Sequence, residues 1–102
     1  MQSISVQKLH DQLEHFALLD VREKWEWDIA HIPGSIHIPL KDIAARIGEL
    51  DQNCAIAVVC HHGGRSAKAA AFLLQHEFSN VYNVSGGIDA WSREIDPSVP
   101  LY

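Results

Sequence analysis

The sequence predicts an α/β fold with a central, mostly parallel sheet of about five strands flanked by helices on both faces. Apolar segments of strand length alternate along the chain with segments whose apolar residues recur at helical spacing. Strands that are joined by helices form right-handed βαβ units, in which the strands run parallel. Ligands of such sheets bind beyond the carboxyl ends of the strands.

Length and composition indicate one soluble, compact unit. A chain of 102 residues suits one hydrophobic core, so we expect a single domain over residues 1–102. Hydrophobic residues make up 47% and charged residues 21%, which is typical of folded soluble proteins. The formal net charge of −5 excludes a general attraction to nucleic acid or to an anionic membrane. No signal-peptide pattern follows Met1, so the expected location is cytoplasmic.

The first half of the chain predicts small elements that end in polar residues. In order, these are a short helix from Val6 capped by Ser5, a strand over 16–21, a helical turn over 25–29, a turn over 31–34 and a strand over 35–38. The first strand runs into Asp20-Val21-Arg22, so charged side chains gather at its carboxyl end.

The second half predicts two helices packed on a central strand and a final strand–helix pair. An apolar stripe at helical spacing predicts a helix over 40–50, with the members Leu40, Ile43, Ala44, Ile47 and Leu50. Residues 55–59 are apolar throughout, as in a strand covered on both faces. A helix over 65–76 has a slim packing face formed by Ala67, Ala70, Ala71 and Leu74. The last elements are a strand over 81–84 and a helix with Ile88 and Trp91.

Cys60 stands where the central strand meets a glycine-containing loop and the next helix. Gly63 and Gly64 permit positive φ, so successive N–H groups can turn toward the sulfur as an anion-binding nest. The helix that begins near Arg65 adds unpaired N–H groups and the positive end of its dipole. Such settings lower a cysteine pKa from about 8.5 to between roughly 3.5 and 7.5. We therefore interpret Cys60 as an ionised nucleophile rather than as only the end of a buried strand.

The remaining candidates have supporting roles. Arg65 opposes the helix dipole, so we expect it to face an anion. His61 and His62 are expected to rim the pocket and to attract an anionic substrate when protonated below roughly pH 6.5. Cys54 is expected to be a small apolar residue at a buried position, without a part in the chemistry. The two cysteines match no zinc spacing, which favours a reducing compartment and predicts no metal site.

Four segments together resemble the rhodanese family of sulfurtransferases, and specifically its single-domain members, over essentially the whole chain. They are Leu18–Glu23, His31–Pro39, the loop Cys60–Ser66 with the pattern C-x-x-G-x-R-S, and Gly86–Trp91 with the pattern G-G-x-x-A-W. The chain departs from the family at Ala30, where glycine is usual, and at Ser35, where alanine is common. Its loop positions His61, His62 and Gly64 also lack the permanent cations of many members that use thiosulfate.

The resemblance implies a rhodanese-like fold and the activity of a thiosulfate sulfurtransferase without a cofactor. The thiolate of Cys60 would attack the outer sulfur of a donor such as thiosulfate, and cyanide or a thiol would remove that sulfur from the resulting persulfide. A sulfur-accepting protein is a further expected partner. Neither nucleic acid nor a membrane is expected to bind. The substrate-binding loop would consist of His61, His62, Gly63, Gly64, Arg65 and Ser66. Asp20 and Arg22 would brace this loop without taking part in the chemistry.

Two alternatives stay open from the sequence. A phosphatase or arsenate reductase also places a cysteine before an arginine between strand and helix. Here four residues separate Cys60 from Arg65, one fewer than in the tyrosine-phosphatase-like signature, and the smaller ring suits a single sulfur atom better than a tetrahedral oxyanion. A rhodanese-like sulfur carrier or protein-interaction module would share all of these residues, so the sequence does not separate it from the enzyme.

Overall fold

A five-stranded, all-parallel sheet forms the centre of the molecule, with the strand order β1-β5-β4-β2-β3. This computed structural model describes residues 2–102. The strands are β1 (Gln2–Ile4), β2 (Phe16–Asp20), β3 (Ile36–His37), β4 (Ala55–Val59) and β5 (Val81–Val84). Because β4 pairs with both β2 and β5, it lies in the middle of the sheet. The predicted α/β class with a parallel sheet of about five strands is confirmed.

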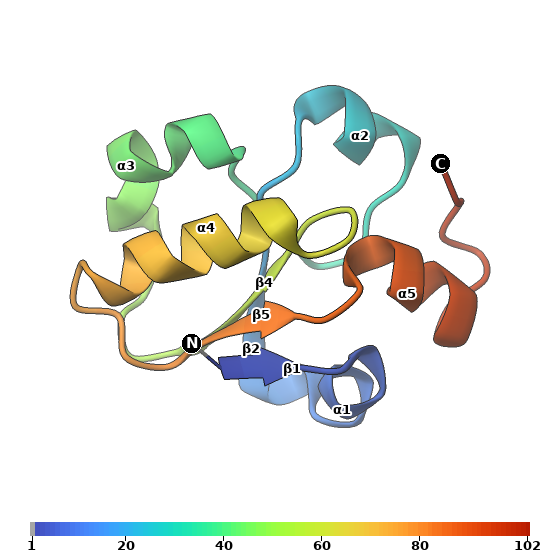
Figure 1. Cartoon of the computed structure of the whole chain (residues 1–102), viewed down its shortest axis with the longest axis horizontal. Helices are drawn as coiled ribbons and strands as arrows, with labels where there is room; N and C mark the ends of the chain where they lie inside the picture. The colour runs from blue at the N-terminus through green and yellow to red at the C-terminus, as the bar shows by residue number, and fades with distance from the viewer. Residues whose placement is uncertain (1) are drawn as a thin grey trace.

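Helices cover both faces of this sheet (Figure 1). They are α1 (Val6–Asp11), α2 (Lys24–Ile29), α3 (Ile43–Arg46), α4 (Gly64–Leu74) and α5 (Gly87–Glu94). Helices α3 and α4 contribute buried residues to one core, whereas α1 and α5 contribute to the other. Within residues 2–102, none of the helices has the length and apolarity needed to cross a membrane.

The uninterrupted apolar run of β4 serves both cores. Successive side chains of a strand point to opposite faces of the sheet. Ile56 and Val58 accordingly join the core under α3 and α4, while Ala57 and Val59 join the core under α1 and α5. All four side chains are at most 1% exposed, so an apolar residue is required at every position. This burial on both faces holds the end of β4, and with it Cys60, in a fixed place.

The prediction of a single helix over 40–50 is wrong. The segment consists instead of a 3₁₀ turn (Leu40–Asp42), one turn of α-helix (α3) and a second 3₁₀ turn (Ile47–Glu49). A 3₁₀ turn has about three residues per turn, so the helical stripe does not stay on one face. Ile43 is buried as expected, but Ala44 is exposed.

The predicted packing face of α4 is displaced by one residue. The buried side chains of α4 are Ser66, Ala69, Ala70 and Leu73. Leu74, which was expected to pack, is 38% exposed, and Ala67 and Ala71 are only partly buried. The hydrogen bonds of Ser66 near the start of α4 turn its side chain into the protein, and residues three, four and seven positions later follow on the same face.

Candidate active site

Cys60 lies directly after β4, at the carboxyl end of the central strand, and its sulfur faces the loop that leads into α4. The N–H group of Gly63 donates a hydrogen bond to Sγ over 3.1 Å. The Ser66 hydroxyl oxygen lies 3.3 Å from the same sulfur. Cys60 is only 2% exposed, but its sulfur is in contact with polar groups and not only with the apolar core.

The loop curls around the sulfur because of one glycine. The N–H group of Gly63 points at Cys60, and Gly63 has φ 135°, in a region that strongly favours glycine, so that the chain can turn there into α4. Gly64 was expected to share this conformation, but it does not have positive φ and is instead the first residue of α4. One positive-φ residue is sufficient, because the first-turn N–H groups of the helix then follow on the sulfur side.

Hydrogen bonds favour the thiolate form of Cys60. Burial by itself raises the pKa of a thiol, because it disfavours the charged form. The hydroxyl of Ser66 and the backbone N–H groups of Ser66, Gly63 and His62 act in the opposite direction, and they leave the pKa of Cys60 below its ordinary value. The loop therefore compensates for the burial of a negative charge.

Asn83 on β5 completes the arrangement around the sulfur, although no sequence motif points to it. Ser66 Oγ donates to Asn83 Oδ1 over 2.5 Å, and Asn83 Nδ2 donates to the Gly63 carbonyl over 3.2 Å. A hydroxyl has one hydrogen to donate. While Ser66 directs it to Asn83, the thiol of Cys60 can donate to Ser66 Oγ; once the thiol ionises, that hydrogen can turn to the sulfur. The only sequence signal was position, since β5 runs parallel to β4 and ends beside it.

Asp20 and Arg22 form a buried ion pair at the carboxyl end of β2. Their side chains are 1% and 0% exposed, and Arg22 Nη2 lies 2.7 Å from Asp20 Oδ2. Burial by itself lowers the pKa of Arg22, but the hydrogen bonds and charges of Asp20 and Tyr102 raise it overall. Arg22 also donates to the Ala30 carbonyl over 2.6 Å. In the part of the chain that the structure describes, no side-chain hydrogen bond joins this pair to residues 60–66, so any bracing of the loop is indirect.

Arg65 faces an anion, as expected, but this anion belongs to the chain itself. Arg65 donates to both carboxylate oxygens of Glu26, over 2.5 and 2.8 Å. These hydrogen bonds lower the pKa of Glu26 to about 2 and raise the pKa of Arg65. Glu26 was missed in the sequence. Its spacing from Glu23 signals the capping box that begins α2, but nothing in the sequence signals a partner on α4.

His61 and His62 lie at the edge of the loop but differ in their surroundings. His61 is half-buried and stacks on Tyr102, with ring centroids 4.1 Å apart. Burial lowers the pKa of His61, and the neighbouring His62 lowers it further. We therefore expect His61 to become charged only at a lower pH than an ordinary histidine. His62 is exposed, and residues 2–102 contain no cluster of three or more potential metal ligands.

The first turn of α5 holds the backbone of the active loop. The N–H groups of Ile88 and Asp89 donate to the carbonyls of Cys60 and His61 over 2.8 and 3.1 Å. Gly87, the residue before these two donors, has φ 60°. A Cβ atom at this position would lie 2.4 Å from the Cys60 oxygen and 2.5 Å from the His61 oxygen. Gly87, as the first residue of α5, thus allows helix and loop to approach closely.

Replacing Gly87 with alanine is expected to destabilise the fold and to displace the loop. A non-glycine residue at positive φ costs about 1–3 kcal/mol, before the clash with the two carbonyls is considered. The free energy of unfolding in urea measures this loss. Gly48→Ala is the matched control, because a Cβ there meets nothing within 4 Å. Equal stability of the two variants would show that the loop does not rely on this close approach.

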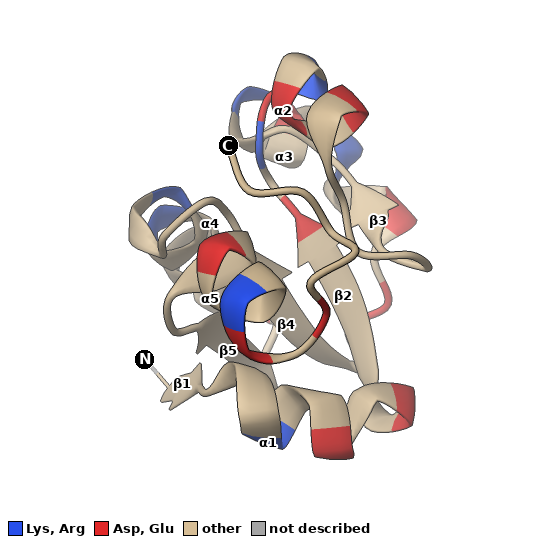
Figure 2. Cartoon of the chain, turned by 90° about the vertical axis from the view of Figure 1, so that its right-hand side faces the viewer, with Lys and Arg blue, Asp and Glu red and all other residues tan. Residues whose placement is uncertain are grey.

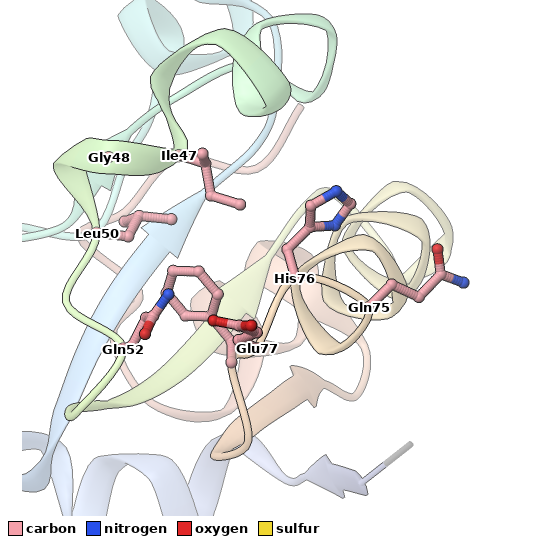
Figure 3. Close-up of a pocket in the computed structure, with 8 residues that line it drawn as sticks. Ile47, Gly48, Leu50, Gln52, Gln75, His76 and Glu77 are labelled. Atoms are coloured by element: carbon pink, nitrogen blue, oxygen red, sulfur yellow. The ribbon is translucent and has the colours of Figure 1, made fainter.

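Cys54 and a cavity beyond the end of α4 lie outside this site. Cys54 is exposed, so its expected place at a buried position is wrong; the hydrogen bond and negative charge of Asp51 raise the pKa of its thiol. The cavity has a volume of about 560 Å³. Figure 3 shows the residues that line it. It is lined by Ile47, Gly48, Leu50, Gln52, Gln75, His76, Glu77 and Phe78, and includes none of the predicted site residues.

A parallel sheet with a cysteine at the end of its central strand fits the resemblance to the rhodanese family, and comparison with known proteins tests this family assignment. The family model described as the rhodanese-like domain matches residues 5–94. The chain belongs to the rhodanese-like family.

Individual relatives carry the names of both enzymes and carriers. The chain is 43% identical over 74 residues to the thiosulfate sulfurtransferase GlpE of Pseudomonas syringae, covering 72% of this chain and 70% of the relative. It is also 43% identical over 86 residues to the putative sulfur carrier protein YrkF of Bacillus subtilis; here 84% of the chain spans only 46% of the relative's length. A rhodanese-related protein of Thermoplasma volcanium superposes with a TM-score of 0.88 at 36% identity, covering 93% of this chain and 94% of that one.

Proposed function

We propose that the chain is a sulfurtransferase, which moves a sulfane sulfur from a donor such as thiosulfate to cyanide or a thiol through a persulfide on Cys60. The observation that carries this proposal is the hydrogen bonding of Sγ by the Gly63 N–H group and its 3.3 Å approach to the Ser66 hydroxyl. These contacts favour a thiolate despite its burial. The name of the Pseudomonas relative supports the same reaction.

The reaction runs in two displacements. In the first, the Cys60 thiolate attacks the outer sulfur of thiosulfate, a new S–S bond forms, and sulfite leaves with the electron pair of the old bond. In the second, cyanide or a thiolate attacks the terminal sulfur and regenerates the Cys60 thiolate. The loop N–H groups stabilise negative charge on the thiolate, on the persulfide and on the leaving group alike. Neither step needs a cofactor, and a reducing compartment such as the cytoplasm would supply the thiol.

A sulfur carrier is the second candidate, and the Bacillus relative's name favours it. A carrier would form the same Cys60 persulfide but deliver the sulfur to a partner protein. A phosphatase is disfavoured, because both terminal nitrogens of the Arg65 guanidinium already donate to Glu26, whose negative charge would oppose a phosphate at the same place. Enzyme and carrier are separated by comparing small thiols with protein thiols as acceptors.

Intact-mass measurement after treatment with thiosulfate is the direct test. We expect the protein to gain one sulfur atom, about 32 Da, and to lose it again when cyanide is added. The Cys54→Ser variant should gain the same mass, because that thiol is exposed and its pKa is raised. Absence of the cyanide-sensitive mass from both proteins would contradict the proposed function for enzyme and carrier alike.

A further inference from the structure

Tyr102 lies outside the segment that matches the rhodanese-like family, yet it contacts the surroundings of the active loop. The family match ends at residue 94. Beyond α5 the chain runs back across the molecule, and its end lies beside α2 in two views at right angles (Figures 1 and 2). There the Tyr102 ring packs edge to face with Trp25 of α2, with centroids 6.1 Å apart.

The hydroxyl of Tyr102 connects the two ion pairs of the site. It accepts a hydrogen bond from Arg22 Nη1 over 2.9 Å and donates one to Glu26 Oε2 over 2.7 Å. Glu26 Oε2 also accepts from Arg65, at the start of α4. Burial raises the pKa of Tyr102 to about 12, against the opposing effect of Arg22, so the hydroxyl keeps its hydrogen at neutral pH. The buried Asp20–Arg22 pair is thereby linked to the first turn of α4.

The ring of Tyr102 reaches the loop at a second point. It stacks on His61, the residue after Cys60, with ring centroids 4.1 Å apart and planes inclined by 12°. The carbonyl of His61 is held from another direction by the N–H group of Asp89. The Tyr102 ring and the α5 backbone therefore act on the same loop residue.

We propose that Tyr102 is a positioning residue, which holds the Cys60–Ser66 loop through its hydroxyl on Glu26 and its ring on His61. Its hydroxyl is committed to Arg22 and Glu26, so Tyr102 has no part in the chemistry. Without it, Glu26 loses a donor and His61 loses its stacking partner. The loop then has more freedom, and the Gly63 N–H group is less well directed at the sulfur.

Thiolate absorbance of Cys60, followed against pH in the Cys54→Ser background, tests this role independently of sulfur transfer. Tyr102→Leu removes both contacts and should move the ionisation midpoint to higher pH. It should also lower kcat/KM for thiosulfate about three- to tenfold, as expected for the indirect loss of one hydrogen bond to a charged group. Tyr102→Phe keeps the ring and should give a smaller change in the same direction. Tyr82→Phe is the matched control, because Tyr82 packs on Phe16 away from the loop.

The midpoint distinguishes positioning from a general structural role, since lower stability alone does not change the ionisation of a folded protein. A Tyr102→Leu midpoint equal to that of the parent would overturn the proposal. If this variant does not fold, Tyr102→Phe decides in its place, and an unchanged midpoint has the same meaning. The expected loss of kcat/KM for thiosulfate rests on the proposed function, but the expected shift of the ionisation midpoint does not. A shifted midpoint in a protein that takes up no sulfur would refute the sulfur transfer and retain the role of Tyr102.

Discussion

Replacing Cys60 with serine should abolish the transfer of sulfur from thiosulfate to cyanide. A serine hydroxyl is not ionised by the loop at neutral pH and cannot hold a sulfane sulfur as a persulfide. We expect thiocyanate formation to fall by at least about a thousandfold, as is usual when a covalent nucleophile is removed. Serine is close in size to cysteine, so the packing at the end of β4 should persist, and circular dichroism would verify this.

Cys54→Ser provides the matched control for that experiment. It makes the same chemical change at an exposed thiol whose nearest polar partner is Asp51. We expect its thiocyanate formation to stay close to that of the unchanged protein. A loss comparable to that of Cys60→Ser would identify Cys54 as a second participating thiol and would contradict the assignment of a single nucleophile.

Arg22→Leu should destabilise the fold far more than the loss of a charge on the protein surface. Asp20 is 1% exposed, and Arg22 provides its side-chain partner through two nitrogen atoms. Removing one member of a buried ion pair costs about 3–5 kcal/mol, because the remaining charge is left uncompensated. That is a large part of the roughly 5–15 kcal/mol that stabilises an ordinary domain. The free energy of unfolding in urea measures the effect.

Arg93→Leu is the matched control for burial. Arg93 pairs with Asp89 on the surface of α5, and its side chain is 61% exposed. Surface ion pairs contribute at most about 1 kcal/mol, so this variant should unfold close to the parent midpoint. If the two arginine variants lose similar amounts of unfolding free energy, the burial of the Asp20–Arg22 pair does not increase its contribution to stability.

Elements with a clear pattern of apolar residues were predictable from the sequence, whereas a very short strand and a segment that mixes 3₁₀ turns with α-helix were not. The run of β4 and the alternation of strands and helices led to the correct fold class. Strand β1 was missed because it has three residues, of which only Ile4 is buried. Its position as an edge strand depends on pairing with β5, a partner far along the chain. The prediction of one helix over 40–50 failed for another reason. The spacing of its apolar residues did not distinguish the 3₁₀ turns at both ends from α-helix.

By itself the sequence determined which residue stands at the end of the central strand and which small residues surround it, because these features depend on neighbours in the chain. Only the tertiary structure decided that Asn83 lies beside Ser66, that Arg65 pairs with Glu26, and that Tyr102 stacks on His61. The last of these contacts joins side chains that are 41 positions apart (102 − 61). Such contacts arise when parallel strands bring their carboxyl ends to the same edge of the sheet, and no local pattern in the chain predicts them.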